Sequence, residues 1–234
     1  MSNIATVMAQ ASSRFTPPTF VGFAQNSSAN GGSITVNLAG IPIQSGDMIL
    51  AAHMVGAGAD RRSSMTLSST GYTLITSIHG PSGYNVNLET YAKIADGTET
   101  SFVTNSTANT TDSVIAMVIV IRNANSVLPT TYATGLEASG AILSVDDVTW
   151  PAVSGEGIFV YFANTAHITG VRTYADPGDM DGFLTTGVND SYDVTGGLGY
   201  VAKQTGSFTA NTWLVSGSGS TSGVAYTVFK LSRA

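Results

Sequence analysis

The sequence contains no cysteine, so neither disulfides nor thiolate metal sites contribute to its fold. Charged residues are also scarce, at 10% against about 25% in an average soluble domain. Lys and Arg together number 9 and Asp and Glu number 15, which gives a net charge of −6. A nucleic-acid-binding protein needs a dense basic surface to neutralise phosphates, so this balance argues against nucleic-acid binding.

Long apolar runs and a secretory signal are missing as well. The longest apolar run, Val114 to Ile121, is much shorter than a membrane span. The first residues lack a basic segment followed by an apolar one, so we expect a cytoplasmic product without membrane insertion. Gly, Ser, Thr and Asn are abundant, as in exposed extracellular β-proteins. A virion protein, assembled inside a cell and displayed outside it, satisfies both expectations.

The pattern from residue 19 onward is that of short β-strands separated by turns. Apolar residues alternate or form short runs, and Gly, Asn and Asp supply the turns between them. The run at 114–121 does not alternate, which predicts a central strand covered on both faces. The strands expected in the first half are Thr19–Ala24, Ser33–Leu38, Met48–Val55, Ser64–Leu67, Tyr72–Ile78, Asn85–Ile94, Thr100–Thr104 and Ser113–Arg122.

Residues 1–16 differ from the rest of the chain. Ile4, Val7 and Met8 follow helical spacing, and Phe15 lies further along before Pro17-Pro18 ends any helix. This segment is either a frayed tail or a docking arm that lays its apolar face on a neighbouring protein. We expect the second, with these four residues as partner-binding residues.

The second half of the sequence follows the first at an offset of about 109 residues, which indicates an internal repeat. Ile41–Asp47 falls on Trp150–Glu156, and Tyr91 falls on Tyr200. We therefore expect an all-β, jelly-roll-like β-sandwich built from two pseudo-repeats, residues 17–125 and 126–234. The halves form either two tandem sandwiches or one compact domain over residues 17–234.

Motifs for catalysis and metal binding are weak. A G-x-S-x-G nucleophile elbow does not occur, and the three histidines lack metal-ligand spacing, so we expect scattered surface or edge histidines and no enzyme. Asp179 and Asp181 resemble part of a calcium loop, but Pro177 replaces the first acid and no glutamate closes the loop. A solvated turn is the expected interpretation, and no cofactor is expected.

Aromatic residues near predicted loops give a second functional expectation. Exposed rings stack on sugars in lectin-like sites. With neighbouring Asn and Asp, these rings could form a shallow glycan site, although most of them could equally cap the core. The candidate residues are Tyr84, Tyr174, Tyr192 and Trp213.

The order of several segments resembles a known family. The segments are Pro18–Gly22, Gly46–Ala52, Gly71–Ile75, Tyr91–Glu99 and Ala116–Arg122. Together they resemble the β-sandwich structural proteins of tailed bacteriophages and prophages, which serve as head decorations, head spikes or tail-fibre components. This chain has Gly71-Tyr72 where a Pro-x-Gly-Trp turn is usual in that family.

The resemblance implies a structural protein on the virion surface that binds other virion proteins through its N-terminal arm. Self-association into a homo-oligomer is expected because it would protect exposed strand edges. The alternative is a glycan-binding module of a tail fibre or spike that attaches to the host surface.

Overall fold

The computed structural model describes residues 17–80, 86–106, 111–129, 131–137, 142–144, 157–167, 173–175, 180–188, 193–203, 212–216 and 223–232. Sixteen β-strands and no helix occur in these ranges. Every predicted strand of the first half is confirmed, with ends that differ by a few residues. The predicted chemical candidates Ile4, Val7, Met8, Phe15, Tyr84, Asp179 and Tyr192 lie outside the described residues.

The first half contains eight strands. They are β1 (Thr19–Ser28), β2 (Gly32–Asn37), β3 (Met48–Gly56), β4 (Met65–Leu67), β5 (Thr73–His79), β6 (Val86–Ile94), β7 (Ser101–Ser106) and β8 (Ser113–Arg122). They form a five-stranded sheet in the order β1-β8-β3-β6-β5 and a three-stranded sheet in the order β2-β7-β4. All pairs are antiparallel.

The described strands of the second half number eight as well. They are β9 (Thr131–Glu137), β10 (Ile142–Ser144), β11 (Gly157–His167), β12 (Thr173–Ala175), β13 (Gly182–Val188), β14 (Asp193–Lys203), β15 (Thr212–Ser216) and β16 (Gly223–Ser232). One sheet has the order β13-β14-β11-β16-β9 and the other β10-β15-β12. Each of the four sheets is therefore built from strands of a single half.

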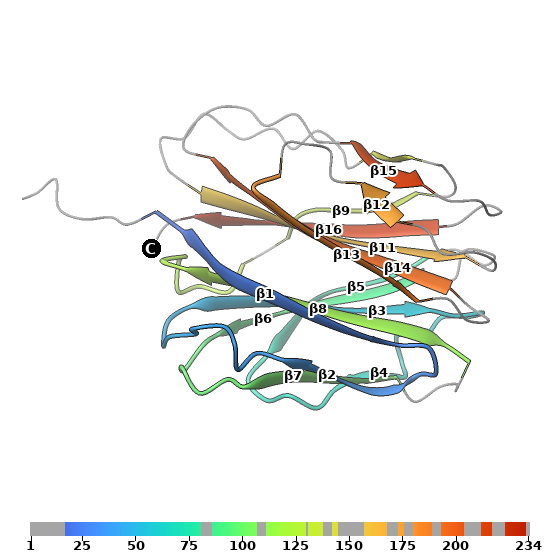
Figure 1. The fold of residues 1–234 in the computed structure, drawn as a ribbon, viewed down its shortest axis with the longest axis horizontal. Coiled ribbons are helices and arrows are strands. Elements are labelled where there is room, and N and C mark those ends of the chain that lie inside the picture. Colours follow the sequence, from blue (N-terminus) through green and yellow to red (C-terminus); the bar gives the residue numbers. More distant parts are fainter. Residues whose placement is uncertain are drawn as a thin grey trace, which may run out of the picture.

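The four sheets stack as layers (Figure 1). The two five-stranded sheets face each other at the centre, and a three-stranded sheet covers the outer face of each. The central core contains Met48, Leu50 and Met117 from one half and Val160 and Phe229 from the other. Separate cores lie under each small sheet. Because β3 and β8 lie between two layers, both their faces are buried, as the unbroken apolar run at 114–121 predicted for β8.

Specific contacts join the two halves across the central core. The rings of Phe20 and Tyr200 stack with centroids 4.5 Å apart. Asn164 Nδ2 donates to the backbone carbonyl of Asn87 at 2.8 Å. The Cα of Gly196 faces the first half so closely that a Cβ there would lie 2.7 Å from Met54 Sδ. The central layer is therefore a packed interface without space for another side chain at this position.

The turns follow the sequence signals. Gly31, Gly46 and Gly97 adopt positive φ angles in three of the turns expected from Gly and Asp. Gly97 has a second constraint, because a Cβ would lie 3.1 Å from the Ser45 backbone nitrogen. Glycine is therefore required there both by the backbone angle and by the close approach of the neighbouring turn.

Candidate binding surface beside strand β6

The position of β5 leaves part of the first large sheet outside the cover of its small sheet. β5 pairs with β6 in the large sheet, while the small sheet has only three strands and packs over β1, β3 and β8. Among the outward side chains of β6, Asn87 and Lys93 contact loop residues, whereas the Tyr91 ring centroid lies 6.1 Å from that of Phe102 in β7. The alternating residues Asn87, Glu89, Tyr91 and Lys93 form a polar row along this side of β6.

One end of the polar row opens into a groove of about 360 Å³. Its lining is Ser68, Ser69, Thr70, Tyr72, Lys93, Asp96, Thr98, Glu99, Ser101 and Val103. Lys93 Nζ donates to Glu99 Oε1 at 2.8 Å and lies 3.5 Å from Asp96 Oδ2. The same ammonium lies 5.8 Å from the centroid of the Tyr72 ring. A cation, two carboxylates and an aromatic ring thus meet in one hollow.

The groove is held in a fixed shape by its own contacts. The Glu99 carboxylate accepts the backbone N–H groups of Asp96 and Gly97 at 2.9 and 3.0 Å. Burial pushes the pKa of Glu99 upward, but these bonds and the one from Lys93 outweigh it, so the pKa lies below its usual value. Burial raises the pKa of Tyr72, so its phenol stays protonated. The rings of Tyr72 and Phe102 pack edge to face, with their centroids 5.1 Å apart.

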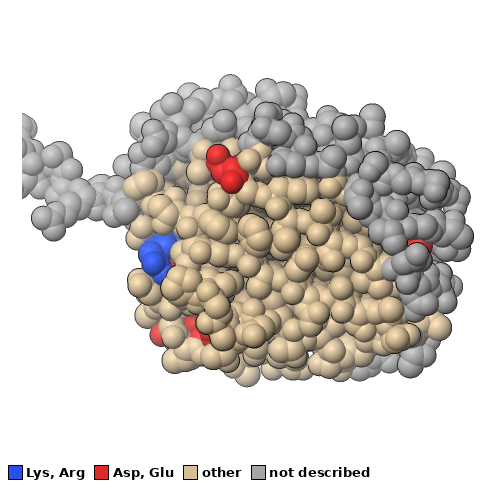
Figure 2. Space-filling model, in the orientation of Figure 1, with Lys and Arg blue, Asp and Glu red and all other residues tan. Residues whose placement is uncertain are grey.

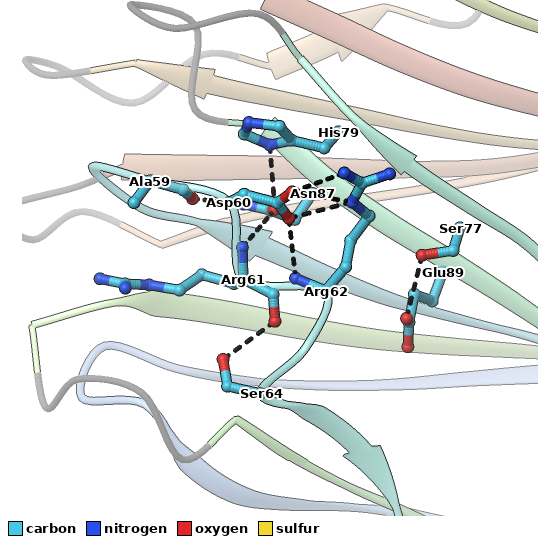
Figure 3. Close-up of polar contacts among 9 residues, drawn as sticks. All are labelled: Ala59, Asp60, Arg61, Arg62, Ser64, Ser77, His79, Asn87 and Glu89. Carbon is cyan, nitrogen blue, oxygen red and sulfur yellow. Dashed lines mark hydrogen bonds and ion pairs between the residues drawn. The ribbon is translucent and has the colours of Figure 1, made fainter.

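The other end of the row is a network that fastens a loop to the sheet (Figure 3). The side chain of Asn87 is buried, and its Oδ1 accepts the Arg61 backbone N–H at 2.8 Å. Its Nδ2 donates to the carbonyl of Ala59 at 3.2 Å, and Oδ1 lies 3.1 Å from His79 Nδ1. The loop between β3 and β4 is therefore tied to β6 by one amide.

The two arginines of that loop contact acidic neighbours. Arg61 Nε donates to Asp112 Oδ2 at 2.7 Å, and the Asp112 side chain is fully buried. Arg62 pairs with Asp60, and both side chains are more than 40% exposed. The hydrogen bond from Arg62 is the main reason that the pKa of Asp60 falls to about 2.

Buried ionisable groups lie between the two ends of the row. Glu89 Oε1 accepts the Ser77 hydroxyl at 3.1 Å, Oε2 accepts the Tyr91 hydroxyl, and burial raises the pKa of Glu89. His53, directly opposite Glu89 on β3, is fully buried, and neither ring nitrogen has a hydrogen-bond partner. The expectation of surface or edge histidines is therefore wrong for His53. Its apolar neighbours in sequence signalled this burial.

The described glycan and calcium candidates do not form a site together. Tyr174 is only 3% exposed and packs in the core beneath the second small sheet, where its hydroxyl bonds to Thr165. Its ring is therefore unavailable for sugar stacking, which corrects that expectation. Trp213 lies on β15, paired with Leu143 in register. Asp181 is exposed, and its Oδ2 accepts the backbone N–H of Ala202 in β14 at 2.6 Å.

Metal-binding clusters and membrane-spanning helices do not occur in the described residues. No group of three or more His, Asp or Glu side chains in these ranges is placed to hold a metal ion. Within the same ranges, no helix has the length and apolar character needed to cross a membrane.

The groove and the polar row were not predicted from the sequence. The signal available was the alternation of polar residues at 87, 89, 91 and 93 with mostly apolar residues within a predicted strand.

Comparison with family models, curated proteins and solved structures found no match to this chain.

Proposed function

We propose that each half of the chain is a jelly roll and that the two halves are an internal duplication. In a jelly roll of eight strands, one sheet has the order 1-8-3-6 and the other contains 2-7-4. The first half has both orders, with β5 added to the large sheet. Adding eight to each strand label converts the neighbour order of the first half into that of the second. This shared order supports a common origin of the halves.

The register of the duplication differs from the offset expected from sequence. That offset carries Met48 onto Gly157, whereas the central core contains Met48 and Ile158. The pairing agrees, because Met48 is opposite Ile121 and Ile158 is opposite Leu231. Here the offset that preserves burial is therefore one residue larger than the offset expected from sequence. A shift by one residue reverses the face of every side chain in a strand.

We further propose that the protein is a structural component displayed on the surface of a bacteriophage particle. The strand order carries this proposal, because jelly rolls recur in viral capsid proteins and in lectins. The packed central core supports the proposal, because it joins both halves into one unit. Figure 2 shows that few charged side chains lie on the described part of one face, which suits a surface that packs against neutral neighbours.

In this proposal, residues 1–16 bind another virion protein of the capsid or tail, and copies of the chain associate with one another. The proposal assigns no catalytic activity and no cofactor.

The test is gold-labelled antibody binding to intact purified particles of the phage whose genome encodes the chain. Regularly spaced label on the particle surface is expected. Label confined to disrupted particles or to unassembled protein would overturn the proposal.

A further inference from the structure

We propose that the groove beside Tyr72 and Lys93 binds a neutral carbohydrate. This site differs from the aromatic positions that the sequence suggested, and it does not depend on where the protein is displayed. The groove volume of about 360 Å³ lies within the range of roughly 300–1,000 Å³ typical of small-ligand pockets.

The chemistry of the lining fits a polyhydroxylated ligand. Most small-molecule pockets are lined mainly by apolar side chains. Here Val103 is the one aliphatic residue, and hydroxyl groups come from both sides of the groove, from Ser68 and Thr70 after β4 and from Ser101 at the start of β7. Sugar hydroxyls both donate and accept hydrogen bonds, as do these side chains. Tyr72, a partly exposed residue of the lining, would supply an aromatic contact for the C–H groups of a pyranose.

The charge of the groove selects neutral sugars over acidic ones. Lys93 is the single cation of the lining and already pairs with Glu99 at 2.8 Å, while Asp96 adds a second carboxylate that is 60% exposed. Hydrogen bonding to Thr98 is the main reason that the pKa of Asp96 lies below its usual value, so this group is ionised at neutral pH. A uronate or a phosphate would meet net negative charge, whereas a sugar hydroxyl would meet acceptors.

Contacts within the lining preform the groove. Gly71 has a φ of +82°, and a Cβ there would lie 3.2 Å from Lys93 Cε, so the backbone lies directly against the lysine stem. The Glu99 carboxylate holds both the lysine and the following turn. A preformed groove loses less conformational freedom on binding, which favours affinity for a weakly binding sugar.

The test is a nuclear magnetic resonance titration of the purified full-length chain. The neutral probes are maltotriose, cellotriose and mannotriose, and the acidic probe is tri-galacturonate. We expect saturable shifts in the backbone amides of residues 68–72 and 96–101 with at least one neutral probe. We expect no such shifts with tri-galacturonate. Absence of saturable groove shifts with all three neutral sugars, or shifts with the acidic sugar alone, would overturn the proposal.

Three variants test whether the sugar binds in the groove. Thr70→Lys places a long side chain in the groove from an exposed position and should weaken binding at least tenfold. Ser63→Lys adds the same charge at an exposed position outside the lining and should leave binding unchanged. Tyr72→Phe keeps the ring and should retain binding. Equal affinity in Thr70→Lys and Ser63→Lys would overturn the proposal, and the outcome is independent of particle display.

Discussion

Among the single residues, His53 has an environment unlike that of a typical histidine. Its two ring nitrogens are buried without partners, and desolvation lowers its pKa from 6.5 to about 3. The unfolded chain therefore binds a proton between these values that the folded chain excludes. Stability from this group is present above pH 6.5 and is lost as the pH falls toward 3, by on the order of 1 kcal/mol per pH unit.

We expect His53→Leu to stabilise the protein and to reduce this loss, because an apolar side chain needs no hydrogen-bond partner in the core. The measurement is urea unfolding of both proteins at pH 7 and pH 5. The stability gap between variant and wild type should widen at pH 5. Leu74→Ala, at an exposed position on β5 that leaves His53 in place, serves as the control and should keep the wild-type pH dependence. A gap that stays constant between the two pH values would show that His53 does not exclude a proton.

At the scale of elements, buried ion pairs attach the loops to the sheets. Asp112 is fully buried beside Arg61, at the start of β8, and fixes the loop between β3 and β4. Asp60 and Arg62 form an exposed pair in the same loop. Removing one partner of a buried pair leaves an uncompensated charge, whereas an exposed pair is screened by water.

Asp112→Ala should therefore lower the free energy of unfolding by about 3 kcal/mol. Asp60→Ala should change it by less than about 1 kcal/mol. Denaturant titrations monitored by circular dichroism give both values. Equal losses in the two variants would mean that the buried pair does not anchor the loop.

The strands and turns were predictable because they depend on local signals. The unbroken run at 114–121 and the glycine turns each act within a few residues. The loop anchor was not predictable, since Arg61 and Asp112 lie far apart in the sequence and meet only through sheet pairing. The groove was missed for the same reason: Tyr72, Lys93 and Glu99 come together because β5 joins the large sheet.

At the scale of the whole molecule, the central core makes the two halves interdependent. Gly196 in β14 faces Met54, Ile115 and Met117 of the first half. A larger side chain at this position would push the two central sheets apart. Overpacking of a close-packed core costs about 1–3 kcal/mol.

We expect Gly196→Val to weaken both halves together. The measurement is hydrogen exchange by mass spectrometry on peptides from β3 and β8 and from β11 and β16. All four strands should lose protection to a similar extent. Gly40→Val, at a site with no atom within 4 Å of an added Cβ, is the control and should leave exchange unchanged. Loss confined to β11 and β16 would contradict a shared cooperative core.

Attachment of the protein to the particle can be measured by co-sedimentation of purified particles lacking this protein with either the wild-type chain or a variant. The test variant replaces Ile4, Val7, Met8 and Phe15 with Ser, and a control variant replaces Ser2, Asn3, Gln10 and Ser12 with Ala. We expect saturable sedimentation of the wild-type and control chains, and at least tenfold weaker sedimentation of the test variant with an unchanged melting temperature. Wild-type sedimentation of the test variant, or no sedimentation of the wild-type chain, would contradict this expectation.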